Sequence, residues 1–245
     1  MSNARTQVKT NVGTAYDAGL RSYMLGVYNY MMLAMLGIGA FAFFANLPGN
    51  EGILNLARGL YLPAFLVLIG LGFFSTKLYM NPNPVIGQVV FWGETALWGV
   101  IVTAVTSIYV PTSVLNVFFM TAAIFGSVSL LGYTTKRDLA PLAQAAFMIM
   151  MGLLLVLLVN VGFAIFAQQP LFAAGGMISM GISAVVVVLI AIVTAWETQK
   201  IKQMYYAIDN AEGRKQYAIF GASQLLSSFV VMFIHLLNLF GVVRE

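Results

Sequence analysis

Residues 139–196 read LAPLAQAAFMIMMGLLLVLLVNVGFAIFAQQPLFAAGGMISMGISAVVVVLIAIVTAW and contain no charged side chain. A helix needs about 20 mostly apolar residues to cross the hydrocarbon core of a bilayer, so this stretch is long enough for two. The polar, proline-containing segment Gln168-Gln169-Pro170 is typical of the loop between them. The residues on either side do not alternate between apolar and polar, as the strands of a membrane β-barrel would. The stretch therefore predicts two membrane-spanning helices.

Other charge-poor stretches on both sides extend the count to seven spans. Residues 78–135 contain one charge, Glu94, and hold two spans separated by a turn at Tyr109-Val110-Pro111-Thr112-Ser113. The remaining three spans are expected near Leu25–Ala45, near Gly59–Ser75 and near Ala218–Gly241. We therefore expect an all-α membrane protein built as a seven-helix bundle.

The composition of the chain agrees with this class and excludes others. Of the 245 residues, 60% are hydrophobic and 8% are charged, whereas soluble domains carry about 25% charged residues. The absence of Cys excludes disulfides and thiolate catalysis, and the single His, His235, excludes a multi-histidine metal cluster. We expect neither a bound metal nor another cofactor, and no nucleic-acid partner, because no basic patch is clustered. The expected surroundings are the lipid bilayer.

The distribution of Lys and Arg predicts an orientation. With the N-terminus in the cytoplasm, the inner segments hold ten of the 12 basic residues, namely Arg5, Lys9, Arg21, Lys77, Lys136, Arg137, Lys200, Lys202, Arg214 and Lys215. Cytoplasmic loops are enriched in these residues, so we expect a multi-pass protein of the bacterial inner membrane with its C-terminus outside. Residues 1–22 are expected to form a cytoplasmic segment that ends in an interfacial turn at Tyr16–Ser22. Residues 23–245 then form the transmembrane domain.

Two ionisable residues inside the predicted spans are candidate functional groups. Glu94 lies near the middle of the third span, where an acid is costly. It can serve as an ion contact or proton site, or as a buried hydrogen-bond partner of a neighbouring helix. His235 fits a neutral hydrogen-bond partner between helices better than a pH switch. We expect no enzyme, because Ser228 and His235 share one helix about 10 Å apart, too far for a catalytic dyad.

Three motifs carry a resemblance to a known family. They are Tyr16–Arg21 followed by Val27–Met31, Gly132–Leu139, and Thr194–Tyr206. In this order they resemble the Bax inhibitor-1, or transmembrane Bax inhibitor motif, family in a bacterial form. The resemblance implies a seven-helix bundle in which the last helix is central and the other six surround it. It also implies one of two functions, a pH-sensitive calcium leak channel with Ca²⁺ as the permeant ion, or a modulator of a membrane protease of the FtsH type.

The family's pH sensor is a pair of hydrogen-bonded aspartates on the sixth and seventh helices. In this sequence Glu197 stands at the first position and Ser228 at the second, so one carboxylate is missing. Two close carboxylates cannot both ionise easily, which is how such a pair senses pH. This alignment predicts that Glu197 and Ser228 lie within side-chain reach, and that any leak is weak and responds little to pH.

The surroundings of Glu197 leave further alternatives open. Glu197 can be a gate or ion ligand, or a solvated interfacial charge that pairs with Lys200 or Lys202. Lys77, at the end of the second span, can pair with Glu197 and hold a pore shut. That contact, which we call the latch, requires the two helix ends to be neighbours.

Overall fold

Seven α-helices form the computed structural model, which describes the backbone of residues 2–173 and 175–244 and the side chains among them from residue 18 onward. The helices are α1 (Ser2–Ala45), α2 (Glu51–Tyr79), α3 (Pro84–Thr106), α4 (Pro111–Thr134), α5 (Ala140–Phe166), α6 (Met177–Ala207) and α7 (Ala211–Phe240). Each contains a segment long and apolar enough to cross a membrane. The predicted seven-helix, all-α class is therefore confirmed.

Local sequence signals explain where the helices begin. Pro84 and Pro111 lie in the first turn of α3 and α4, where proline's missing N–H removes no helical hydrogen bond. Asn83 caps α3 through its side-chain oxygen, which accepts a hydrogen bond from the Val85 amide at 3.0 Å. Asn210 caps α7 in the same way through the Gly213 amide, at 2.6 Å. The short links between helices place consecutive helices antiparallel.

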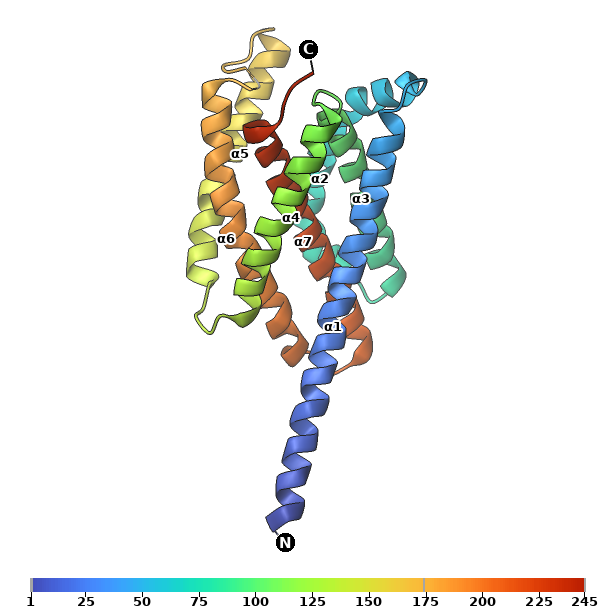
Figure 1. The fold of residues 1–245 in the computed structure, drawn as a ribbon, viewed down its shortest axis with the longest axis vertical. Helices are drawn as coiled ribbons and strands as arrows, with labels where there is room; N and C mark the ends of the chain where they lie inside the picture. Colours follow the sequence, from blue (N-terminus) through green and yellow to red (C-terminus); the bar gives the residue numbers. More distant parts are fainter. Residues whose placement is uncertain (1, 174, 245) are drawn as a thin grey trace.

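The last helix, α7, runs through the centre of the bundle (Figure 1). In its most apolar window 72% of the residues are buried, a larger share than in any other described span. It packs against α1, α2, α3, α4 and α6. This confirms the expected central position of the last helix.

One helix departs from the expected ring of six around α7. Helix α5 packs chiefly on α6, and none of the residues in its most apolar window is buried. Its sequence is apolar on all sides, so it is stable against lipid without an interior face of its own. The expectation that all six helices surround α7 is therefore corrected to five, with α5 outside.

The first helix also differs from expectation. The backbone is helical from Ser2 to Ala45, so the interfacial turn predicted at residues 16–22 is wrong. No proline interrupts this segment, and single glycines are tolerated within a helix. The N-terminal part of α1 extends alone beyond the other helices (Figure 1). We call the end of the bundle from which it extends the N-terminal end.

The chain ends at the opposite end of the bundle, where its last residues pair with the α3–α4 connection. Val110 donates its amide to the Val242 carbonyl at 2.8 Å, and the Arg244 amide donates to the Ile108 carbonyl at 2.9 Å. The Arg244 side chain adds a hydrogen bond to the Tyr109 carbonyl at 2.8 Å. These contacts fix the C-terminal tail to the far end of the bundle.

Candidate functional site

Glu197 lies inside the bundle because α6 continues for several turns beyond it, to Ala207. The side chain is 5% exposed and faces α7, where the Ser228 hydroxyl donates a hydrogen bond to its Oε2 atom at 2.7 Å. The structure thus brings together the two residues that the family resemblance aligns. It does not support the alternative of a solvated interfacial charge.

Two close helix contacts set the position of Glu197. On one side, a Cβ atom at Gly132 of α4 would overlap the backbone of Ala195. On the other, a Cβ atom at Gly221 of α7 would lie 2.9 Å from the Ile201 side chain. Both glycines let neighbouring helices approach α6 within about one turn of Glu197.

The neighbouring basic residues do not pair with Glu197 in the described structure. The Lys200 ammonium lies 4.8 Å from the centroid of the Trp196 ring, and the Lys202 ammonium donates to the Tyr133 carbonyl at 2.9 Å. Lys77 is exposed at the end of α2, a helix that packs mainly on α3. Because Glu197 is buried and Lys77 is at the surface, the latch between them is not formed.

Glu94 faces the interior as well, in a second polar cluster between α2, α3 and α7. Its Oε2 atom accepts a hydrogen bond from the Tyr79 hydroxyl at 2.8 Å and another, short one from the Ser223 hydroxyl. Glu94 is 6% exposed and Tyr79 is 1% exposed. One turn further along both helices, the Trp98 indole donates to the Ser227 hydroxyl at 3.2 Å.

Neighbouring serines of α7 therefore form hydrogen bonds to two different helices, α3 and α6. Ser223 and Ser227 are four residues apart and share the face toward α3, whereas Ser228 is rotated by about 100° toward α6. Together the contacts place two buried carboxylates around the middle of α7, within five residues of each other along that helix. We call Glu197, Ser228, Glu94, Tyr79 and Ser223 the inner polar layer.

A second polar group lies nearer the C-terminal end of α7. His235 Nδ1 is 2.9 Å from the Ser183 hydroxyl of α6, and the Asn238 amide donates to the same hydroxyl at 2.8 Å. Asn238 also donates to the Ser179 hydroxyl at 3.0 Å. His235 thus makes a contact between α6 and α7 of the kind that the sequence favoured, a hydrogen bond between helices. We call these four residues the outer polar layer.

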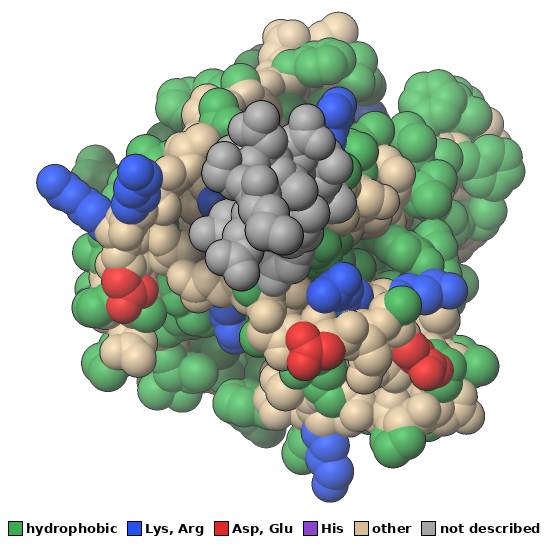
Figure 2. All heavy atoms as spheres, turned by 90° about the horizontal axis from the view of Figure 1, so that it is seen from below, with side chains coloured by type: hydrophobic (Ala, Val, Ile, Leu, Met, Phe, Trp, Pro, Cys, Tyr) green, Lys and Arg blue, Asp and Glu red, His purple; other side chains and the backbone are tan. Residues whose placement is uncertain are grey.

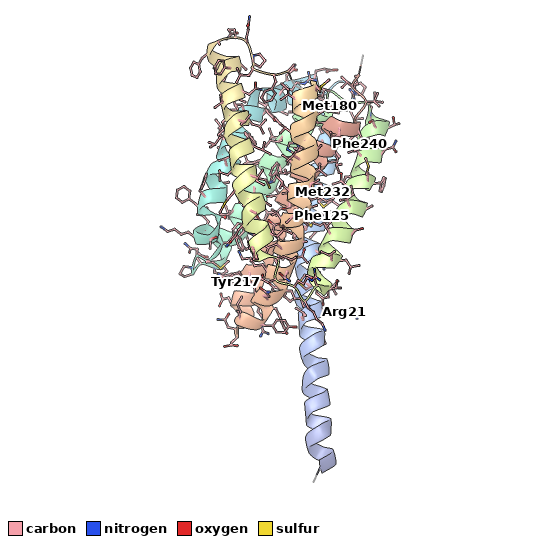
Figure 3. The ribbon with its side chains drawn as sticks, turned by 90° about the vertical axis from the view of Figure 1, so that its left-hand side faces the viewer. Arg21, Phe125, Met180, Tyr217, Met232 and Phe240 are labelled. Carbon is pink, nitrogen blue, oxygen red and sulfur yellow. The ribbon has the colours of Figure 1, made fainter. Side chains whose placement is uncertain are left out.

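Apolar side chains separate the two layers. Between Ser228 and His235, α7 carries Phe229, Val230, Met232 and Phe233, all of them buried. Phe118 and Phe125 of α4 pack on Phe229, with ring centroids 5.6 and 5.4 Å apart. Figure 3 shows Met232 and Phe125 at middle height in the bundle. The structure therefore holds a packed apolar barrier between the polar layers.

The polar residues do not form an obvious metal centre. Among the described residues, no three His, Asp or Glu side chains gather in a group that could hold a metal ion. Glu197 and Glu94 instead take their hydrogen bonds from hydroxyl groups. An ion at this site would meet single carboxylates, each with hydroxyl groups beside it.

Sequence reasoning found both carboxylates and Ser228 but missed Tyr79, Ser223 and Trp98. From the sequence, no role was assigned to Ser223 and Ser227. Their spacing of four residues, matched by Glu94 and Trp98 on α3, was a usable sign of two facing helices. Tyr79 carried no comparable signal, because it follows the span and resembles an ordinary interfacial tyrosine.

Comparison with known proteins identifies the family. A model of the family described as inhibitor of apoptosis-promoting Bax1 matches residues 20–245. The chain is 32% identical to RP147 of Rickettsia prowazekii over 243 residues, which cover 98% of each protein. It is 29% identical to the inner membrane protein YbhL of Escherichia coli over 227 residues, covering 91% of this chain and 93% of YbhL. The match extends over nearly the whole transmembrane bundle, and this chain therefore belongs to the Bax inhibitor-1 family of integral membrane proteins.

Proposed function

We propose that this protein is a cation leak pathway, with Ca²⁺ as a permeant ion, whose route passes Glu94 and Glu197 beside α7. The observation that carries the proposal is the pair of buried carboxylates at membrane depth. Each accepts a hydrogen bond from an α7 serine, and among the described residues neither accepts a hydrogen bond from Lys or Arg. Acidic groups inside a membrane domain are costly and commonly mark ion pathways.

The ligand count favours passage of an ion over its storage. Ca²⁺ prefers about six to eight oxygen ligands. Glu197 and Ser228 supply far fewer, and among the described residues no cluster of three acids or histidines completes the shell. Conduction requires a site weak enough for the ion to leave, so a sparse site suits a slow leak.

The packing suggests that this conformation is closed. The apolar side chains of α7 between Ser228 and His235 separate the inner polar layer from the outer one. An ion can pass only if Phe229 and its neighbours on α4 move apart. We propose that the Glu197–Ser228 hydrogen bond helps to hold α6 against α7 in this closed arrangement.

Flux measurements test the proposal directly. The purified wild type and the Glu197→Gln and Glu94→Gln variants are each reconstituted into liposomes loaded with a Ca²⁺-sensitive dye. The rate of Ca²⁺ entry is then compared among them. A family member that carries both aspartates serves as the positive control. We expect a weak leak in the wild type that each variant changes at least severalfold. A wild type that conducts no more than empty liposomes, beside an active control, would refute the proposal.

A second candidate function is the modulation of a membrane protease of the FtsH type. The observation that favours it is the N-terminal part of α1, which extends beyond the bundle as a helix available to a partner (Figure 1). Removal of residues 2–14 should then abolish co-purification with the protease while Ca²⁺ flux is unchanged. A truncated protein that still binds the protease as the full chain does would exclude this segment as the contact.

A further inference from the structure

A groove on the lipid-facing side separates α1 from α4. Both helices pack on α7 but make little contact with each other, and the groove between them has a volume of about 490 Å³. Its lining includes Met31, Met32 and Met35 of α1, Phe125 and Gly126 of α4, and Phe229 of α7. The volume falls within the range of roughly 300–1,000 Å³ found for small-molecule sites.

The groove runs along the N-terminal part of the membrane-spanning segment of α1, from Arg21 to Met35. Its lining belongs to the membrane-spanning segments of α1, α4 and α7. The Tyr28 hydroxyl lies 2.6 Å from the Ser129 hydroxyl, which joins the two walls at one point. In a bilayer an open apolar groove is filled by lipid chains or by another helix, because water does not enter the hydrocarbon region.

Positive charge lies at the N-terminal end of the groove. Arg21 lines the groove and is exposed, and among the described residues its guanidinium has no hydrogen-bond partner. Figure 3 shows Arg21 near the lower end of the bundle, below Phe125. Tyr133 lines the same groove, and the centroid of its ring lies 4.7 Å from the ammonium of Lys202. Lys202 uses one of its three N–H donors on the Tyr133 carbonyl, which leaves two for a ligand.

The wider N-terminal end also carries basic side chains. Figure 2 shows Lys and Arg side chains spread over this end, with some Asp and Glu side chains among them and apolar side chains around the periphery. Lys136 and Arg137, which follow α4, are both exposed. Apolar walls with cations at one end match an anionic amphiphile, whose head group lies at the interface and whose chain lies in the hydrocarbon core.

We propose that the groove between α1 and α4 binds one anionic phospholipid. Its acyl chain lies along the methionines of α1 and beside Gly126, and its phosphate is held by Arg21 with Lys202. A second helix would fill the apolar part equally well, but an apolar helix surface supplies no anion for Arg21 and Lys202 at the basic end of the groove. The binding does not depend on whether the protein conducts ions.

Native mass spectrometry of the whole protein, released from detergent with added phosphatidylglycerol or phosphatidylcholine, tests the proposal. We expect wild type to retain one phosphatidylglycerol in preference to phosphatidylcholine. Arg21→Gln should reduce that preference about fivefold, the effect of one basic residue at an anionic surface. Lys215→Gln, at an exposed cation on α7 away from the groove, is the matched control and should change little.

A second pair of variants tests the apolar part. No atom lies within 4 Å of a Cβ atom placed at Gly126 or at Gly152 of α5, so both positions accept a larger side chain. Gly126→Leu should fill the groove and lower retention of phosphatidylglycerol, whereas Gly152→Leu should not. A phosphatidylglycerol with a photoactivatable acyl chain should crosslink to the α1 peptide that contains Met31 and Met32.

Three results would overturn the proposal. The first is equal retention of the two lipids by wild type, and the second is an equal effect of Arg21→Gln and Lys215→Gln. The third is a wild-type dimer that Gly126→Leu converts to monomers, which would show that a second copy of the chain occupies the groove. Circular dichroism of each variant establishes that it is folded before its lipids are compared.

Discussion

At the scale of single residues, α7 positions two acids through serine hydroxyls. Ser228 donates to Glu197, and Ser223 donates to Glu94. A hydroxyl satisfies a carboxylate oxygen without adding charge, so neither acid has the like-charge partner that the family resemblance implies for an aspartate pair. The pH response of the protein should therefore differ from that of relatives with both aspartates.

Restoring the second acid should restore pH sensitivity. In Ser228→Asp the new carboxyl would lie close to Glu197, because the serine hydroxyl is already 2.7 Å from Oε2. Two carboxyls at this spacing cannot both ionise easily, so they share a proton over part of the pH range. We expect Ca²⁺ flux into proteoliposomes to depend steeply on pH in Ser228→Asp and weakly in the wild type.

Ser228→Asn is the matched control, since it adds a similar volume without an acid and should not create pH dependence. Steep pH dependence in the wild type would show that a carboxyl pair is not needed. A folded Ser228→Asp protein with a flat profile would contradict the role assigned to this position.

The hydrogen bond from Tyr79 to Glu94 should contribute to stability. Tyr79→Phe removes one of the two donors to a buried carboxyl, and interhelical hydrogen bonds in membrane proteins contribute about 0.6 kcal/mol on average and up to roughly 1.7 kcal/mol. We expect a lower midpoint of thermal unfolding in detergent. Tyr61→Phe, at an exposed tyrosine of the same helix, is the control, and equal midpoints for both variants would contradict the contact.

At the scale of helices, close approach depends on glycine at a few positions only. Gly132 faces the backbone of Ala195, whereas Gly126 on the same helix has open space around it. Because the obstruction at Gly132 is backbone and not a flexible side chain, α4 and α6 must move apart to admit a methyl group. Glu197 follows Ala195 closely, so its position depends on this contact.

We expect Gly132→Ala to destabilise the bundle by about 1–3 kcal/mol, the usual cost of overpacking. Gly126→Ala should be neutral or slightly stabilising, since alanine is the better helix former. Thermal unfolding of both variants in the same detergent measures the difference. Indistinguishable midpoints would mean that α4 and α6 are not in contact at this position.

The helices themselves were predictable because charge-free length and proline-containing breaks determine where a membrane span can lie. The position of α5 was not, because a helix that is apolar on all sides gives no sign of which face meets protein. The burial of Glu197 was one of two alternatives that the sequence left open. Its basic neighbours suggested an interface, but Lys200 and Lys202 lie along aromatic rings while α6 continues past them.

The polar contacts were predictable only in part. Ser228 was identified by alignment with a known motif, and the structure places its hydroxyl at Glu197. Tyr79 and Ser223 were not identified, because their partnership with Glu94 depends on how α2, α3 and α7 pack against one another. Single-helix patterns do not contain that information.

At the scale of the whole molecule, an odd number of spans places the two ends of the chain on opposite sides of the membrane. The seven helices and the positions of the termini in Figure 1 agree with this arrangement. The distribution of basic residues predicts which side is cytoplasmic. Ten of them lie in the segments at the N-terminal end, whereas only Arg58 and Arg244 lie at the opposite end. The orientation thus stays a prediction from charge.

Labelling of a single cysteine tests that orientation. The chain contains no cysteine, and Val243 lies in the C-terminal tail with 58% of its surface exposed, so Val243→Cys creates one accessible thiol. We expect a membrane-impermeant maleimide to label this variant in intact cells, after the outer membrane is made permeable. Lys136→Cys, in the exposed α4–α5 connection at the N-terminal end, should react only after the inner membrane is broken. The opposite pattern would reverse the orientation, and would place Arg21 and the basic end of the α1–α4 groove in the outer leaflet.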